Sequence, residues 1–496
     1  MQNFTLILVS LLFFSCSGCS SKDPHNGPDD GRDDITITSQ TVVPSFVGIG
    51  PQWGGYDNIK AWTGNASLSN DDWNKLYTRL RYMKPPLMRI MVSPGWNYDY
   101  PPGNNFEKSD HLLIKMLDFC QTEGIDVIFG EWGHQGGSGG IDDAWVETAA
   151  NFYDYLVRTK GYTCIKYYNM VNEPNGDWSS INGNYNLWEQ LIKKFHAKLV
   201  EKDLANTCQI IGPDVAIWNT NLVSWVSNVR NNIGNIVTAY DIHTYPSENS
   251  VRSGEYTNTI KAYRNAAPAS AIMIMAELGF KYETNSELDV ENKKRINADN
   301  YASDDSNMMV YEAFYGTDMA DVVIQNMLAG YAGVILWDLD DAQYSVVNMW
   351  RLKRWGFWNI QGAETFGNPD DENIRPWFYT MSLLSRYFPK GTEIKSVNLP
   401  NKRGVRAVAG IKNGKYTIAI VNSNVATYNV NLKMENGVEL NNLKKFVYIA
   451  GEGAAFTGKL DSSGFAAPES ENLSLDLSGS IKIELPPRSF FLYTNM

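Results

Sequence analysis

The chain has 496 residues, of which 43% are hydrophobic and 20% are charged, which is a globular composition. Its length predicts a large domain and a smaller one, because a single hydrophobic core rarely extends over so many residues. The formal net charge of −12 argues against nucleic acid as a partner, since proteins that bind it carry a basic surface.

Residues 1–19 have the pattern of an export signal. Their apolar run, 4–14, is too short to cross a membrane as a helix. Ser15-Cys16 and Gly18-Cys19 each place a small residue before a cysteine, which resembles a bacterial lipoprotein cleavage site. We therefore expect an exported, outer membrane-anchored lipoprotein that faces the periplasm or the cell exterior and carries lipid on Cys16 or Cys19. A plain secretory signal is the alternative.

Residues 20–34 are polar, acidic and contain glycine and proline, which predicts a disordered tether. The acidic stretch soon after the cysteines resembles the surface-export tethers of bacterial lipoproteins, and a solubilising linker is the alternative. The remaining cysteines, Cys120, Cys164 and Cys208, have no metal-type spacing. Buried free thiols are favoured for them over a pairing of Cys164 with Cys208 on neighbouring strands.

From residue 45 to 388 the chain alternates between strand-like and helix-like runs. Trp73, Leu76, Leu80 and Met83 recur at helical spacing, with Ser69 as a plausible cap. The predicted strands are 46–50, 87–93, 126–131, 165–171, 208–212, 237–243, 272–277 and 333–337. The predicted helices are 71–83, 110–122, 144–159, 187–202, 222–232, 255–266 and 311–329, with a last helix near 376–387.

Eight such units predict parallel strands closed into a (β/α)8 TIM barrel. An open doubly wound sheet is the alternative, and the absence of a glycine-rich phosphate motif after the first strand weakens it. Residues 389–496 lose the helical pattern and predict a C-terminal antiparallel β-sandwich, with Asn413-Gly414 as a hairpin turn. Residues 35–44 could add a strand to this sandwich.

Two connections, 280–307 and 338–375, are too long to be plain linkers. They follow the seventh and eighth strands and so should lie on the face of the barrel where active sites form. We expect them to shape a sugar-binding cleft, although most of the aromatic residues in 338–375 should pack within the connection itself.

Two glutamates stand at the ends of predicted strands. Glu173 follows the fourth strand in Asn172-Glu173-Pro174, and Glu277 ends the seventh in Ala276-Glu277-Leu278-Gly279. Retaining glycosidases need two carboxyl groups about 5–5.5 Å apart, one as acid/base and one as nucleophile. We assign Glu173 as the acid/base, which must hold a proton near neutral pH, and Glu277 as the nucleophile, which must be ionised. Two structural loop carboxylates are the alternative.

This constellation resembles the clan A retaining glycoside hydrolases, such as families 5, 30, 39 and 51, over residues 45 to about 387. The resemblance implies the roles just given, and the following sandwich is similar to that of families 30, 39 and 51. It also implies that the Asn172 amide binds the sugar 2-hydroxyl, that Arg89 keeps the nucleophile ionised, and that Tyr245 contacts the nucleophile beside His243. Outward ion pairing of Arg89 and a structural role for Tyr245 are the alternatives.

Several further residues are candidates for sugar contact. Trp337 ends the eighth strand and looks like the platform under the sugar at the cleavage site. Trp132 and Trp53 follow the third and first strands. Glu131 is a rival carboxylate, but its sequence context resembles neither catalytic position. Asp338, Asp340 and Asp341 could bind calcium, but an EF-hand-like loop needs a longer series of ligands, so a polar loop surface is favoured and no metal or cofactor is expected.

The sequence therefore predicts a retaining β-glycosidase that hydrolyses a poly- or oligosaccharide by double displacement. A catalytically idle carbohydrate-binding barrel is one alternative, and the glutamate pair argues against it because a binder does not need both. A transglycosylase with the same site, which passes the sugar to an acceptor in place of water, is the other.

Overall fold

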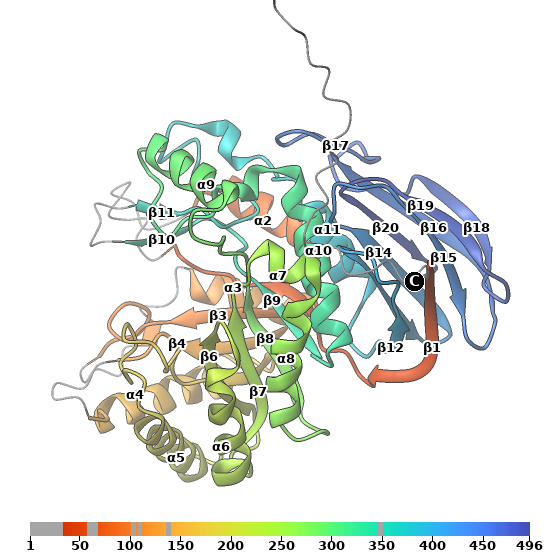
Figure 1. Ribbon diagram of the computed structural model, residues 1–496. Helices are drawn as coiled ribbons and strands as arrows, with labels where there is room; N and C mark the ends of the chain where they lie inside the picture. The colour runs from red at the N-terminus through yellow and green to blue at the C-terminus, as the bar shows by residue number, and fades with distance from the viewer. Residues whose placement is uncertain (1–32, 57–67, 101–105, 108–111, 135–139, 346–350) are drawn as a thin grey trace, which may run out of the picture.

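The computed structural model describes residues 33–56, 68–100, 106–107, 112–134, 140–345 and 351–496, as a barrel with a β-sheet domain packed against its side (Figure 1). The predicted export signal, Cys16, Cys19 and most of the tether lie outside these residues. Among the helices described, none combines the length and the apolar character that crossing a membrane requires.

Eight parallel strands form the barrel, in the order β2-β9-β8-β7-β6-β5-β4-β3. Gln52, just after β2, bridges to Arg89 on β3 and so brings the two edges of the sheet together. The predicted barrel is confirmed, and the open sheet is excluded. The strands are β2 (Gly48–Pro51), β3 (Leu87–Val92), β4 (Asp126–Glu131), β5 (Ile165–Asn169), β6 (Gln209–Ile217), β7 (Val237–Thr244), β8 (Ile272–Leu278) and β9 (Gly333–Leu336).

Helices pack around the barrel: amphipathic ones such as residues 70–83 bury one face against the strands, whereas the helix of residues 313–328 is buried along nearly its whole length. In the first of them, Ser69 accepts from the Asp72 backbone N–H while the Asp72 carboxylate accepts from Ser69, so the predicted cap is confirmed as a capping box. The helices are α2 (Asn70–Met83), α3 (Leu113–Glu123), α4 (Asp143–Asp154), α5 (Tyr185–Glu201), α6 (Val223–Ile233), α7 (Glu248–Ser253), α8 (Glu255–Ala266), α9 (Glu287–Ala298), α10 (Ala313–Leu328) and α11 (Trp377–Tyr387).

Strand β6 extends to Ile217, five residues past the end that the sequence predicted. Pro213 lacks an N–H for the ladder and therefore reads as a strand end. In the structure the register shifts between Pro213 and Val215, and Asp214 has a left-handed φ of 57° at this irregularity. The bulge turns the Asp214 side chain into the barrel, where it becomes part of the site described below.

The C-terminal domain is a ten-stranded, mostly antiparallel sheet, which confirms the predicted β class. Its strands hydrogen-bond into one continuous sheet that encloses a second core. Asn413 and Gly414, both with positive φ, form the predicted two-residue turn. The strands are β12 (Glu393–Asn398), β13 (Val405–Lys412), β14 (Lys415–Asn422), β15 (Tyr428–Met434), β16 (Glu439–Ala450), β17 (Phe456–Thr457), β18 (Ser470–Asp476), β19 (Ile481–Leu485) and β20 (Ser489–Thr494).

The first described strand, β1 (Asp34–Val43), belongs to this sheet and not to the barrel. It pairs antiparallel with β12 and parallel with β15, so the chain enters the C-terminal domain before it begins the barrel (Figure 1). The sheet domain is therefore connected to the barrel twice, once before the first barrel strand through β1 and once after the last barrel helix through β12.

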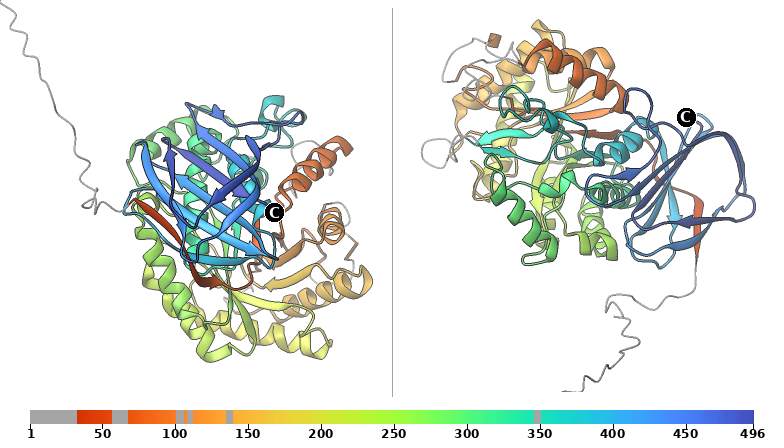
Figure 2. Two further views of the ribbon diagram at one scale, coloured as in Figure 1. Left: turned by 90° about the vertical axis from the view of Figure 1, so that its right-hand side faces the viewer. Right: turned by 90° about the horizontal axis from the view of Figure 1, so that it is seen from above.

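The sheet domain also packs broadly against α10 and α11 of the barrel (Figures 1 and 2). Alternation along β13 sends Ala407 and Ala409 into the second core and Val408 into the main core shared with the barrel. The Tyr448 hydroxyl donates to the Ala313 carbonyl at 2.7 Å, and the buried Ser423 hydroxyl donates to Asp321 at 2.6 Å. The C-terminal domain therefore braces the barrel. Cys120, Cys164 and Cys208 are free thiols, as predicted.

Candidate functional site

Glu173 and Glu277 face one another at the C-terminal end of the barrel. Glu277 lies within β8, and Glu173 lies four residues beyond the end of β5. Oxygens of the two carboxylates and a ring nitrogen of His243 all lie within 4.8 Å of one another. Glu173 also has a φ of 45°, in the left-handed region that a residue with a side chain rarely adopts. Both carboxylates therefore lie in one cleft, and the backbone conformation at Glu173 is an unusual one.

Three donors converge on the Glu277 carboxylate. Arg89 Nη1 donates to Oε1 at 2.5 Å, the Tyr245 hydroxyl donates to Oε2 at 2.6 Å, and His243 Nδ1 lies 3.5 Å from Oε2. Burial raises the pKa of Glu277 above its ordinary value, while the charges of His243 and Arg89 act in the opposite direction. The donors thus favour the ionised form that a nucleophile needs.

Arg89 is fully buried in the middle of the barrel and binds four polar side chains. Besides Glu277, it donates to Gln52 at 2.6 Å, to Asn172 Oδ1 at 2.9 Å and to Asp214 Oδ2 at 3.1 Å. The alternative of an outward ion pair is therefore excluded, because Arg89 points inward to Glu277, as the resemblance implied. Since Arg89 occupies the carbonyl oxygen of Asn172, the amide nitrogen of Asn172 remains to donate to a ligand.

His243 connects the glutamate pair to Asp214. Its Nε2 lies 2.8 Å from Asp214 Oδ1 and its Nδ1 lies 3.1 Å from Glu173 Oε1. Burial would lower the pKa of His243, but the charges of Asp214 and Glu277 raise it to about 10. The ring therefore carries two protons at neutral pH. Because a metal ligand must offer a free lone pair, this histidine does not suit the metal site that its position between two carboxylates would otherwise suggest.

A cavity of about 810 Å³ opens above the pair and is rich in aromatic residues. Trp132 and Trp337, both predicted, line it with their rings 6.5 Å apart and perpendicular. The predicted contact from Trp53 is wrong: Trp53 is fully buried and packs on Trp73 and Phe119 in the core. The side chain of the preceding Gln52 points into the barrel and binds Arg89, so alternation along the extended chain directs the Trp53 ring outward against the helices.

The two long connections form one wall of this cavity. Lys281 and Asp305 come from the first of them, Lys353 and Trp355 come from the second, and all four line the cavity. The second contains a short hairpin of β10 (Ala342–Ser345) and β11 (Arg351–Lys353). Both connections therefore shape the cleft, as expected.

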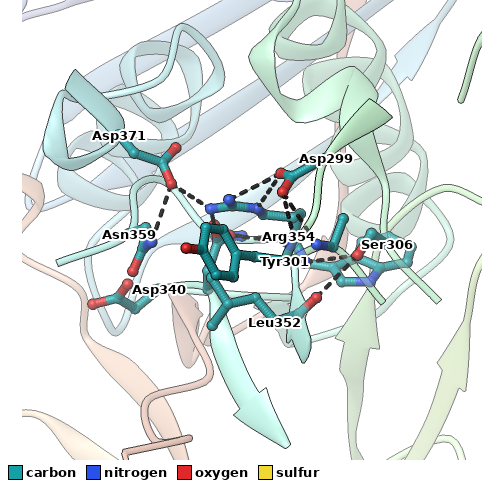
Figure 3. Close-up of polar contacts among 12 residues, drawn as sticks. Asp299, Tyr301, Ser306, Asp340, Leu352, Arg354, Asn359 and Asp371 are labelled. Atoms are coloured by element: carbon teal, nitrogen blue, oxygen red, sulfur yellow. Dashed lines mark hydrogen bonds and ion pairs between the residues drawn. The ribbon is translucent and has the colours of Figure 1, made fainter. Parts of the chain in front are cut away.

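Arg354 fastens the two connections together (Figure 3). Its guanidinium pairs with Asp299 of the first connection at 2.9 Å and with Asp341 of the second at 3.1 Å, and it also contacts Asp371. Ser306 donates to the Leu352 carbonyl at 3.2 Å beside it. This buried network fixes β11 and hence the cavity wall that Lys353 and Trp355 supply.

The expected polar surface at Asp338, Asp340 and Asp341 is wrong, because all three are buried. Asp341 accepts hydrogen bonds from Arg375, and Asp340 accepts from the Tyr56 hydroxyl at 2.9 Å. Burial raises the pKa of Asp340 to about 8. Asp340 and Asp341 hold the second connection in place, a role that polar residues in a predicted loop do not indicate.

Glu131, the rival carboxylate, is fully buried and does not belong to the described lining of the cavity. Tyr98 and Tyr168 donate to it at 3.1 and 3.0 Å. Burial raises the pKa of Glu131 to about 8, so it holds a proton at neutral pH. It is a buried acid within the barrel, and the described geometry gives it no access to a ligand.

Four functional candidates were missed in the sequence. Asp214 was missed because the proline before it predicts the end of the strand. The signal that could have found it is an acidic residue close after a buried apolar run. The other three are tryptophans that line the cavity while remaining more than half exposed, namely Trp96, Trp178 and Trp218. Their loops have no hydrophobic periodicity, so the only indication of a binding role in the sequence was that these residues are tryptophans.

No protein-family model matches the chain, and no curated protein matches its sequence. Solved structures do resemble it. A glycoside hydrolase family 30 subfamily 8 xylanase from Clostridium acetobutylicum superposes with a TM-score of 0.61 at 15% identity, covering 93% of this chain and 99% of that one.

An α-L-arabinofuranosidase from Thermotoga maritima gives a TM-score of 0.60 at 13% identity, over 93% and 99% of the two chains. A monomeric β-xylosidase from Caulobacter crescentus gives 0.58 at 12% identity, over 93% and 98%. At these identities the likeness shows the fold: a TIM barrel with a C-terminal β domain.

Proposed function

We propose that this protein is a retaining glycoside hydrolase that cleaves a poly- or oligosaccharide by double displacement. The observation that carries the proposal is the separation of the Glu173 and Glu277 carboxylates, whose oxygens lie within 4.8 Å of each other. Retaining enzymes hold their two carboxyl groups about 5–5.5 Å apart, whereas inverting enzymes need about 6.5–9.5 Å to admit a water molecule.

In the first step Glu277 attacks the anomeric carbon and forms a glycosyl ester, while Glu173 gives a proton to the leaving oxygen. Arg89 and Tyr245 hold the two oxygens of Glu277 at 2.5 and 2.6 Å, which fixes the direction of attack.

In the second step Glu173 removes a proton from water, and the water attacks the ester. Glu173 can act as a base at this point because it gave its own proton to the leaving oxygen in the first step. His243 faces Glu173 at 3.1 Å with its charge fixed by Asp214, and so provides a constant positive neighbour in both steps. We assign to the Asn172 amide, whose oxygen accepts from Arg89, the binding of the hydroxyl next to the reacting carbon.

The fold supports this function, because the similar structures are described as a xylanase, an arabinofuranosidase and a xylosidase. The substrate we propose is a neutral plant-type or host glycan, and xylosides and arabinofuranosides are the first to test. We also propose that the protein is exported and held at the outer membrane through lipid on Cys16 or Cys19.

The test is the hydrolysis of 4-nitrophenyl β-xyloside, β-glucoside and α-L-arabinofuranoside, and of xylan, by the wild type and three variants. Glu277→Ala should lose at least about 10⁴-fold in turnover, because no group replaces the nucleophile. Glu173→Ala should keep the first step only for dinitrophenyl glycosides, whose leaving group needs no proton. Glu131→Gln, a buried glutamate on the neighbouring strand, is the matched control and should keep full activity. Full turnover by Glu277→Ala would refute the assignment.

A further inference from the structure

Trp178 contacts the proposed acid/base directly. Its indole Nε1 donates to Glu173 Oε2 at 2.9 Å, although more than half of the side chain is exposed. A tight turn, in which the Gly176 N–H donates to the Glu173 carbonyl at 3.0 Å, brings the ring back over the chain. A Cβ on Gly176 would lie 2.2 Å from that ring, so only glycine permits this position. The loop is therefore shaped to hold an indole against Glu173.

Trp218 stands beside Trp178 and marks where the cleft continues. The two rings are perpendicular with their centroids 6.4 Å apart, and Trp218 is 59% exposed. A second cavity of about 510 Å³ shares Trp218, Tyr245 and Lys281 with the first. Each cavity is large enough for a small-molecule ligand, so the cleft exceeds what a single sugar needs.

The position of Glu173 indicates on which side of the reacting bond this extension of the cleft lies. The acid/base must face the leaving oxygen, and the oxygen of Glu173 bound by Trp178 is not the one that faces His243. Trp178 and Trp218 follow β5 and β6, and the second cavity continues past β7 and β8. Trp132 and Trp337 follow β4 and β9, away from this extension. We therefore assign them to the sugar that becomes attached to Glu277.

We propose that Trp178, Trp218 and the second cavity bind the leaving-group side of the substrate, across at least two sugar residues. This inference rests on the proposed function and adds to it a preference for chains over glycosides of one sugar. Exposed indole faces suit the apolar faces of sugar rings. Trp178 has a second role as a positioning residue, because its N–H fixes the oxygen of Glu173 that exchanges the proton.

The lining of the second cavity indicates which chains fit. It offers hydroxyl groups, such as those of Ser247, Ser250 and Thr259, and the carboxylates of Glu255 and Glu283. Carboxylates accept hydrogen bonds from sugar hydroxyls and repel anionic sugars. Because Lys281 also lines this cavity, its charges do not exclude anionic sugars, and the ligand we propose is a hydroxyl-rich oligosaccharide.

The experiment compares kcat/KM for an aryl glycoside of one sugar with that for β-1,4-xylo-, β-1,4-gluco- and β-1,6-gluco-oligosaccharides of two to six sugars. Trp218→Ala should lose at least tenfold on the longer chains and less than threefold on the aryl glycoside. Trp178→Phe, which keeps a ring but loses the N–H, should slow phenyl glycosides more than dinitrophenyl glycosides and shift the pH profile. Val425→Ala, an exposed apolar residue of the sheet domain, is the control.

Equal losses by Trp218→Ala on both kinds of substrate, or none, would overturn the assignment of the leaving-group side. Binding to the Glu277→Gln variant, measured by tryptophan fluorescence with the same oligosaccharides, does not need turnover. Weaker binding after Trp218→Ala would support the site even if the wild type hydrolysed none of these substrates. That lack of hydrolysis would overturn only the proposed function. Binding that is unchanged by Trp218→Ala would overturn the site.

Discussion

Replacing Glu131 with Gln should make the protein more stable in alkaline solution. Glu131 is fully buried between Tyr98 and Tyr168, and burial raises its pKa from an ordinary 4.5 to about 8. Between these two values the folded chain keeps a proton that the unfolded chain releases. The free energy of unfolding therefore falls by about 1.4 kcal/mol per pH unit as pH rises through this window, or about 5 kcal/mol in all.

Glutamine has nearly the same shape as the protonated acid but does not titrate, so this loss should disappear in the variant. Urea unfolding followed by tryptophan fluorescence at pH 5 and pH 8 measures the effect. The wild type and Glu131→Gln should differ by less than about 1 kcal/mol at pH 5, and the variant should be more stable by about 4 kcal/mol at pH 8. Other buried acids titrate in both proteins and cancel in the difference. Parallel pH dependences would show that Glu131 is not held neutral by burial.

Three further changes probe the site and its support. Tyr245→Phe removes the 2.6 Å hydrogen bond to Glu277 and should lower kcat by about 10- to 100-fold, since a bond to a charged group contributes about 1.5–3 kcal/mol; an unchanged kcat would contradict this. Asp214→Asn removes the charge that raises the pKa of His243 to about 10, so that NMR titration of the ring should show a lower pKa, and a constant value would be inconsistent with the geometry. Arg354→Met removes one of the two cations that pair with the buried Asp341 and Asp371, since Arg375 remains, and should cost about 3–5 kcal/mol in urea unfolding; a loss below about 1 kcal/mol would mean that the network does not hold the cleft wall.

The barrel was predictable because its strands are nearly continuous apolar runs that alternate with amphipathic helices. Charges inside such runs were the best indicators of the site. Arg89 interrupts Leu87-Met88-Ile90-Met91, and a buried charge requires partners, so chemistry indicated a paired charge, while its place beside the nucleophile was implied by the resemblance to clan A hydrolases. Glu173 and Glu277 were found for a related reason, since polar groups at strand ends meet on one face of a barrel.

What could not be predicted depends on geometry that has no local signature. Asp214 enters the site because β6 continues through a proline with a bulge, and proline in a sequence indicates a strand end. Trp53 lies two residues after β2 and packs in the core, whereas Trp132 lies one residue after β4 and lines the cavity, and alternation along an extended chain directs side chains one residue apart to opposite sides. Trp178 contacts Glu173 through a turn that depends on Gly176. The two residues are only five positions apart, but no sequence periodicity predicts this contact.

The central claim is that Glu277 becomes covalently attached to sugar during each turnover. The direct measurement uses the 2-deoxy-2-fluoro dinitrophenyl glycoside of the sugar that the wild type hydrolyses, followed by mass spectrometry of the intact protein and of its peptides. The account predicts one added sugar per chain, attached to the peptide that contains Glu277, and slow recovery of activity as water releases it. Inactivation without added mass, or label on Glu173 or any other residue, would contradict it.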